Sequence, residues 1–219
     1  DEVSGTTGRP QGRGRAAPLE SVTLINGRMP GELRQRPNFG SLGAIHPDAP
    51  LLLDFGLRRG GQPDYTNRVI DLLCPFGKGQ RALIVAPAKA GKTTVLQAVA
   101  EGVARNHPGA QLFILLVDER PEEVTEMEMA GAGEVVASSF DQPPERHAEV
   151  AELTLERARR QVELGRDSVI ILDSITRLAR AYNTLERGTG RTLSGGLDAN
   201  AMEKPKRFLG SARYVDPSR

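Results

Sequence analysis

The sequence contains few of the residues that crosslink a chain or stack on other rings. Its 219 residues include one cysteine, Cys74, no tryptophan and only 4% aromatic side chains. A single cysteine excludes an intrachain disulfide and any zinc site built from cysteines. The scarcity of aromatic rings leaves few platforms on which nucleic-acid bases could stack. With 24 glycines and 15 prolines, the composition is typical of a globular chain with loop-rich segments.

Long hydrophobic runs are also absent. No stretch approaches the roughly 18 consecutive apolar residues that indicate a transmembrane helix. The first residues, DEVSGTTGRP, lack the apolar segment of a secretory signal peptide. We therefore expect a cytoplasmic protein without a membrane partner.

The charges are almost balanced but unevenly distributed. The formal net charge of +1 excludes a uniformly basic nucleic-acid coat. Residues 41–173 contain an excess of acidic side chains, whereas residues 1–40 and 174–219 contain an excess of basic ones. This pattern agrees first with ordinary variation in surface charge, and a polyanion that contacts the ends is the alternative.

The first 50 residues show little sustained hydrophobic periodicity. Residues 1–18 are rich in glycine and arginine and nearly free of apolar side chains, which predicts a disordered arm. Residues 20–26 alternate apolar and polar side chains, which predicts a short strand that ends at the Asn26-Gly27 turn. Residues 27–50 are interrupted by prolines and glycines and are interpreted as a linker.

The rest of the chain alternates between two patterns. Short, continuous apolar runs at 82–86, 112–117, 134–138 and 168–172 predict strands that are buried on both faces of a parallel sheet. Helical stretches over 93–106, 121–129 and 144–164 lie between them. This alternation predicts the α/β class, an architecture that often binds nucleotides.

The motif with the clearest chemistry is ALIVAPAKAGKTT, residues 82–94. A predicted strand leads into a loop that ends in Gly91-Lys92-Thr93, where a helix is predicted to begin. In such a phosphate-binding loop, backbone N–H groups and the helix N-terminus hold phosphate oxygens. Lys92 is expected to neutralise the β- and γ-phosphates of ATP, and the Thr93 hydroxyl to bind Mg²⁺. Ala86 stands where the general motif has its first glycine.

Two predicted strand ends supply carboxylates for the same site. Asp173 follows the run 168–172, and we expect it to hold the Mg²⁺ shell, a role compatible with capping the next helix. Glu119 and Arg120 follow the run 112–117. Ligands bind at the carboxyl ends of parallel strands, so Glu119 is our candidate general base. Arg120 is a candidate for contact with phosphate or a neighbouring subunit, and a helix cap is the alternative role of Glu119.

The remaining reactive side chains do not predict a second site. His46, His107 and His147 are scattered and have no histidine or carboxylate four residues away. We therefore expect no metal site beyond nucleotide-bound Mg²⁺. His147 is predicted to be solvated, and Cys74 to be a small buried residue.

Longer motifs resemble a known family. The chain contains, in this order, the segments APAKAGKTT, LLVDERPEEVTEM, GEVVASSFD, ILDSITRLARAYNT, LSGGLDANA and KPKRF. Together with Arg146-His147, they resemble the bacterial transcription termination factor Rho family from about Pro37 to Arg213. DERPEEVTEM and DSITRLARAYN distinguish Rho from other RecA-like ATPases, including rotary ATP synthase subunits. Ala86 also agrees with the A-P-x-K-A-G-K-T form that is usual in Rho.

The resemblance implies a hexameric, ATP-driven RNA translocase and helicase that terminates transcription. It implies ATP and Mg²⁺ as cofactors, and single-stranded RNA and the RNA polymerase elongation complex as partners. The implied catalytic residues are Lys92, Glu119 and Asp173, with Thr93 and Asp173 at the metal. The implied nucleotide contacts are Gly77, Lys78, Gly79, Gln80, Arg81, Ala82, Lys89, Ala90, Gly91, Lys92, Thr93, Thr94 and Arg120. Loop 188–196 is expected to line an RNA channel, with contacts at Arg191, Thr192, Gly195 and Gly196.

The resemblance also divides the chain. Residues 1–18 are predicted as a disordered arm, residues 19–50 as the end of an N-terminal OB-fold RNA-binding domain with its linker, and residues 51–219 as the front part of a RecA-like ATPase domain. No apolar run follows Asp173, although RecA-like cores place their next strand there, and the arginine finger is missing. We therefore expect a truncated chain that is inactive in hydrolysis by itself. A nucleotide-binding fragment without motor activity and another RecA-like hexameric ATPase are the alternatives.

Overall fold

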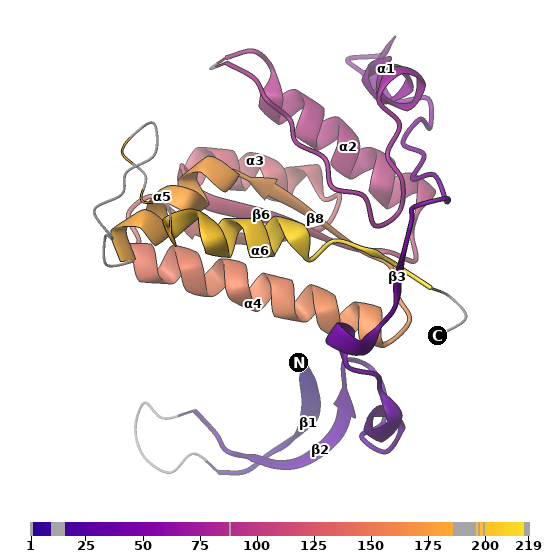
Figure 1. Ribbon diagram of the computed structural model, residues 1–219. Coiled ribbons are helices and arrows are strands. Elements are labelled where there is room, and N and C mark those ends of the chain that lie inside the picture. The colour runs from indigo at the N-terminus through magenta and orange to yellow at the C-terminus, as the bar shows by residue number, and fades with distance from the viewer. Residues whose placement is uncertain are drawn as a thin grey trace.

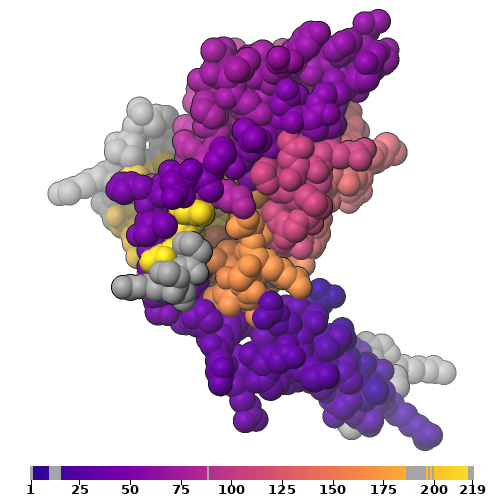
Figure 2. Space-filling view, turned by 90° about the vertical axis from the view of Figure 1, so that its right-hand side faces the viewer, coloured from indigo at the N-terminus to yellow at the C-terminus, as the bar shows by residue number. Residues whose placement is uncertain are grey.

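The computed structural model describes residues 2–9, 16–87, 89–185, 196, 198 and 200–216. Its largest part is an α/β body in which helices cover both faces of a parallel sheet (Figure 1). A β-hairpin formed by N-terminal residues makes a small lobe at one end of this body (Figure 2). The predicted α/β class is confirmed.

The sheet of the body has three parallel strands in the order β7-β6-β8. The central strand is β6 (Gln111–Glu119), flanked by β7 (Glu134–Ser139) and β8 (Ser168–Asp173). The predicted strands at 112–117, 134–138 and 168–172 are confirmed. Because the strands are parallel, their carboxyl ends meet at one edge of the sheet, which is where such sheets bind ligands.

Side chains of β6 alternate between two hydrophobic clusters. Leu112 and Ile114 pack on one face with α2 (Lys92–Asn106) and α3 (Pro121–Ala130). Leu115 and Val117 pack on the other face with α4 (Pro144–Glu163) and α5 (Ile175–Leu185). A strand that is apolar on both faces requires this double cover, and the helices predicted over 93–106, 121–129 and 144–164 provide most of it.

Residues 82–86 do not form the predicted strand. They lie outside the described sheets, and Leu83 and Val85 are 65% and 84% exposed, although Ile84 packs against the core. A strand depends on hydrogen bonds to a neighbour. None of the described strands pairs with this segment or with the outer edge of β8. The apolar sequence therefore predicted a strand whose pairing partner the described residues do not supply.

The N-terminal residues contain more structure than the predicted arm. β1 (Val3–Thr7) pairs antiparallel with β2 (Leu19–Ile25), so the prediction of disorder is wrong for these first residues. Thr6 and Ser21 share a hydrogen bond of 2.6 Å between their hydroxyl groups across the pair. The strand predicted at 20–26 is confirmed. Since both strands are largely exposed, backbone pairing rather than burial stabilises the hairpin.

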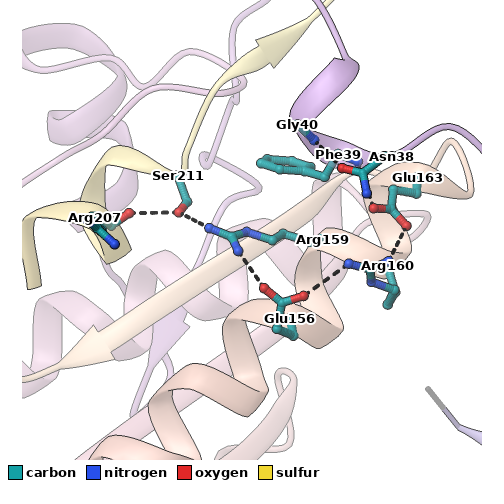
Figure 3. Close-up of polar contacts among 9 residues, drawn as sticks. All are labelled: Asn38, Phe39, Gly40, Glu156, Arg159, Arg160, Glu163, Arg207 and Ser211. Atoms are coloured by element: carbon teal, nitrogen blue, oxygen red, sulfur yellow. Dashed lines mark hydrogen bonds and ion pairs between the residues drawn. The ribbon is translucent and has the colours of Figure 1, made fainter. Parts of the chain in front are cut away.

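The segment predicted as a linker is docked on the body (Figure 3). Phe39 is buried, and the guanidinium carbons of Arg159 and Arg213 lie 5.4 and 4.5 Å from the centre of its ring. Its backbone N–H donates a hydrogen bond of 2.8 Å to Glu163, at the end of α4. The buried Glu163 carboxylate also pairs with Arg36 at 2.9 Å. Residues 36–39 therefore form an ordered joint between the hairpin lobe and the body.

The remaining elements are short and border the body. β3 pairs with β9 and β4 pairs with β5, both antiparallel. Within the part of the chain that the structure describes, no helix has both the length and the apolar composition needed to cross a bilayer. The bounds of these elements are η1 (Glu32–Gln35), η2 (Phe39–Ser41), β3 (Ala44–Ile45), β4 (Arg58–Arg59), β5 (Gln62–Pro63), α1 (Thr66–Leu73), η4 (Asn200–Met202), α6 (Glu203–Gly210) and β9 (Tyr214–Val215).

Candidate nucleotide-binding site

The phosphate loop leads into α2 through Gly91. This residue precedes the helix with φ of 86°, a left-handed conformation that glycine adopts without strain. Lys89 also has a positive φ, of 63°, and the N–H of Ala90 donates to the carbonyl of Pro87 at 3.3 Å. The loop therefore turns sharply onto the N-terminus of α2, whose free N–H groups can bind an anion.

Lys92 and Asp173 meet at the edge of the sheet. The Lys92 ammonium group, in the first turn of α2, forms an ion pair with Oδ1 of Asp173, the last residue of β8. The Asp173 side chain is only 4% exposed, and a buried carboxylate requires a partner of opposite charge. Two residues predicted from separate motifs are thus in direct contact.

Glu119 ends β6 beside this pair and is 3% exposed. Asp118 has φ of 58°, and the register with β7 shifts between Val117 and Glu119, so a bulge turns the end of the strand. Burial raises the pKa of Glu119 to about 8. Its hydrogen bond with Glu123 and the charge of Asp173 act in the same direction, whereas Arg177 lowers the pKa. A carboxylate of this basicity is suited to general-base chemistry near neutral pH.

A cavity of about 420 Å³ lies between the phosphate loop and Glu119. This volume lies within the range of roughly 300–1,000 Å³ that is usual for small-molecule sites. The lining of the cavity combines basic side chains with the carboxylates of Glu119 and Glu123. The lining residues are Ala86, Pro87, Lys89, Gly91, Lys92, Thr93, Glu119, Glu123 and Arg177.

Arg177 is a residue of this cavity that sequence reasoning missed. Its Nε lies 3.1 Å from Oε1 of Glu119, and its Nη1 lies 3.4 Å from Oδ2 of Asp118. Nη1 also donates a hydrogen bond to the backbone carbonyl of Asp118. The available signal was its position four residues after Asp173, which places it in the first turn of the next helix, α5.

The predicted nucleotide contacts at residues 77–82 lie elsewhere. They line a second cavity, of about 290 Å³, together with parts of α4, β8 and residues 208–215. Lys78 pairs with Asp167 at 2.6 Å, at the opposite end of β8 from Asp173. A Cβ atom on Gly79 would lie 2.2 Å from the backbone nitrogen of Tyr214. The structure does not bring this stretch to the phosphate loop, and its contact with a nucleotide stays a prediction.

Other predicted contacts are only partly located. Arg120 is exposed in front of α3 and does not line the larger cavity, and neither do Ala90 and Thr94. The predicted RNA contacts Arg191, Thr192 and Gly195 lie outside the described residues. Gly196 is described, and its carbonyl accepts a hydrogen bond of 3.4 Å from the Asn183 side chain.

Two predictions about reactive side chains are wrong. His147 is 5% exposed, because the first turn of α4 directs it toward the sheet, where Nδ1 lies 2.7 Å from Oγ of Ser138. Cys74 is exposed, because it follows the last residue of α1. Among the described residues, no cluster of three or more histidine, cysteine, aspartate or glutamate side chains could hold a metal ion.

Comparison with known sequences agrees with this geometry. Residues 66–197 match the ATP synthase alpha/beta family, nucleotide-binding domain. The chain is 62% identical over 217 residues to transcription termination factor Rho of Gemmatimonas aurantiaca, covering 99% of this chain and 29% of that protein. It is 50% identical over 216 residues to transcription termination factor Rho of Pseudomonas fluorescens biotype C, covering 99% of this chain and 51% of that protein. The predicted resemblance to Rho is confirmed, and the chain spans about half or less of the length of these relatives.

A solved structure supports the fold. A prototypical ATPase from the type III secretion system of pathogenic bacteria superposes with a TM-score of 0.65 at 21% identity. The match covers 94% of this chain and 54% of that one. At this level of identity the likeness shows the fold alone, in agreement with the predicted RecA-like core.

Proposed function

We propose that the chain, which belongs to the ATP synthase alpha/beta family through its nucleotide-binding domain, is the ATP-binding part of an RNA-dependent ATPase and helicase of the Rho type. The proposed protein is a cytoplasmic homohexamer that moves along single-stranded RNA and releases the transcript from RNA polymerase. The observation that carries the proposal is that Lys92 and Glu119 line one cavity and that Lys92 forms an ion pair with Asp173. The similarity to Rho relatives over 99% of the chain supports it.

In this proposal, the loop and Lys92 bind the triphosphate. The N-terminus of α2 offers N–H donors, and the Lys92 ammonium group turns from Asp173 to the β- and γ-phosphates. Thr93 and Asp173 then present a hydroxyl and a carboxylate, the oxygen ligands that Mg²⁺ prefers, so these residues would hold it. When bound, Mg²⁺ supplies positive charge that offsets the charge of the phosphate oxygens.

Glu119 supplies the base. Its carboxylate accepts a proton from the attacking water while the water oxygen bonds to the γ-phosphorus. The bond from that phosphorus to the bridging oxygen breaks, and ADP and inorganic phosphate leave. Arg177, in contact with Glu119, holds the carboxylate at the cavity.

A second candidate is a nucleotide-binding unit without turnover. The observation that favours it is the exposure of Leu83 and Val85 in a segment that pairs with none of the described strands. The phosphate loop then follows residues 82–86, which are not hydrogen-bonded into the described sheet. A loop that is loosely positioned can bind a nucleotide without catalysing its hydrolysis efficiently.

Two measurements on the chain and on its full-length protein distinguish these candidates. Binding of a fluorescent ATP analogue with Mg²⁺ tests the nucleotide site, and phosphate release with and without poly(C) RNA tests the motor. RNA-stimulated turnover supports the first candidate, and binding without turnover in both proteins supports the second. Failure of both proteins to bind the analogue would refute the nucleotide site itself.

A further inference from the structure

We propose that His147 is a positioning residue for Glu119, acting through the hydroxyl group of Ser138. The inference rests on the proposed function, because it assigns a role relative to the proposed general base. His147 does not line the larger cavity and would touch neither nucleotide nor water there. Its effect on the reaction would be transmitted by the end of β7.

The contact between the two side chains is short and buried. Oγ of Ser138 lies 2.7 Å from Nδ1 of His147, and the residues are 3% and 5% exposed. Either atom can be the donor, depending on the tautomer of the ring. The hydrogen bond links Ser138 of β7 to His147 in the first turn of α4, and thereby fixes the end of the strand to the helix.

β7 is the strand whose backbone pairs with β6 next to Glu119. Ser138 pairs with Val117 and Ser139 pairs with Glu119, so the two β7 residues oppose the bulge at Asp118. The N–H of Phe140 donates to the carbonyl of Glu119 at 3.1 Å. A shift of β7 at Ser138 would therefore be passed directly to the backbone that aims the Glu119 carboxylate.

The surroundings of the pair are apolar. Val117, on the paired strand, belongs to the same hydrophobic cluster as Ala148 and Ala151 of α4. Loss of one partner leaves the other polar group buried without its hydrogen bond, which is costly. Two apolar side chains could fill the same space between α4 and β7. The hydrogen-bonded pair instead favours the one alignment of α4 on β7 in which both polar groups are satisfied.

Turnover measurements on the full-length protein test the proposal. We expect Ser138→Ala and His147→Ala each to lower kcat for RNA-stimulated ATP hydrolysis about tenfold, since small misplacements of a reacting group are sufficient for such losses. Binding of the fluorescent ATP analogue is expected to stay within about twofold of wild type, because the phosphate loop is untouched. His147→Asn, which keeps a polar atom near the position of Nδ1, is expected to recover part of the rate.

Two further readouts separate positioning from a general loss of structure. The double variant is expected to be no slower than the slower single variant, since both changes break one interaction. The pH at which turnover falls on the acid side is expected to move, because Glu119 titrates in altered surroundings. Arg146→Ala is the matched control: Arg146 pairs with Glu149 at 2.8 Å on the exposed side of the same helical turn, and its loss is expected to leave kcat unchanged.

Ser138→Ala removes a single hydroxyl and keeps the proposal testable if His147→Ala does not fold. Wild-type kcat and an unchanged pH profile in folded Ser138→Ala would overturn the inference, as would losses that multiply in the double variant. A loss of ATP binding that parallels the loss of turnover would also overturn it. If the wild-type protein neither binds nor hydrolyses ATP, the proposed function itself fails, which is a distinct result.

Discussion

The Nε atom of Arg177 lies 3.1 Å from Oε1 of Glu119 and thereby joins α5 to the end of β6. The guanidinium group opposes the effect of burial on this carboxylate, because its positive charge favours the ionised form. A second contact, 3.4 Å from Nη1 to Oδ2 of Asp118, orients the guanidinium plane. The contact therefore orients the proposed base and lowers its pKa, against the larger effect of burial.

Replacement of Arg177 by alanine is expected to raise the pKa of Glu119 further. Less of the carboxylate is then ionised at pH 7, so kcat/KM for ATP should fall at least about tenfold there and recover in part as the pH increases. The measurement is the pH dependence of kcat/KM in the full-length protein. Arg180→Ala, an exposed change on the same helix, is the control. If kcat/KM of Arg177→Ala falls on the acid side at the same pH as in wild type, this electrostatic role is contradicted.

Glu119→Gln separates binding from chemistry. The amide keeps the size of the side chain but cannot accept the proton, so turnover should fall by about a hundredfold or more. Affinity for the fluorescent ATP analogue should remain, because Lys92 and the loop are unchanged. Glu126→Gln, on the exposed side of α3, is the matched control for loss of one negative charge. Near-normal hydrolysis by Glu119→Gln would remove Glu119 from the role of base.

The same residue makes the stability of the fold depend on pH. The pKa of Glu119 is about 8 in the folded protein against a reference value of 4.5, so the folded state holds an extra proton between these values. Its contribution to stability is therefore complete below pH 4.5 and is lost as the pH rises toward 8. The glutamine in Glu119→Gln does not titrate. The free energy of unfolding of this variant should therefore increase relative to that of wild type as the pH rises from 4.5 to 8, by at most about 1.4 kcal/mol per pH unit. Urea titrations at pH 5, 7 and 9 measure the difference, and a constant difference would contradict the raised pKa.

The central fold was predictable because its sequence pattern is local. Continuous apolar runs predicted β6, β7 and β8, and the helical stretches between them predicted α2, α3 and α4. Residues 82–86 have the same apolar pattern but no paired neighbour among the described strands, and strand formation depends on that neighbour. The prediction for β1 was wrong in the opposite sense: the composition of this segment indicates disorder, but its pairing with β2 orders it.

The site was predictable where chemistry follows directly from a motif. Lys92, Glu119 and Asp173 each stand at a loop or strand end that parallel topology brings to one edge. Arg177 was missed because its role depends on the reach of a long side chain across to β6. His147 was misjudged because its burial depends on which side of α4 faces the sheet, which the neighbouring Arg146 obscures. The position of residues 77–82 depends on the path of residues 213–214, far along the chain.

Lys92→Ala tests the phosphate loop. Without the ammonium group, the triphosphate loses its main positive partner in the protein, and Asp173 loses the counter-charge with which it forms an ion pair. We expect affinity for the fluorescent ATP analogue to fall at least about tenfold and turnover to be abolished. Lys204→Ala, which removes an exposed ion pair of 3.3 Å with Glu152, should change neither. Unaltered nucleotide affinity in Lys92→Ala would show that the cavity is not the phosphate site.

The joint between the hairpin lobe and the body depends on Glu163. Its carboxylate is inaccessible to solvent and receives Arg36 and Arg160 at 2.9 Å each, together with the backbone N–H of Phe39 at 2.8 Å. Figure 3 shows this carboxylate directed from α4 toward the start of η2. A buried carboxylate with these partners holds the segment through charge as well as shape.

Glu163→Gln is therefore expected to release residues 36–39 from α4. The amide cannot compensate two guanidinium groups, and breaking a buried ion pair by changing one partner typically costs about 3–5 kcal/mol. Because Arg36 and Arg160 are about one-fifth exposed and partly hydrated, we expect a loss of about 2 kcal/mol in the free energy of unfolding. Limited proteolysis should cut the joint faster, whereas Glu149→Gln, in an exposed ion pair, should behave as wild type. Equal stability and equal proteolysis in Glu163→Gln would show that packing of Phe39 between its two arginines holds the joint without this carboxylate.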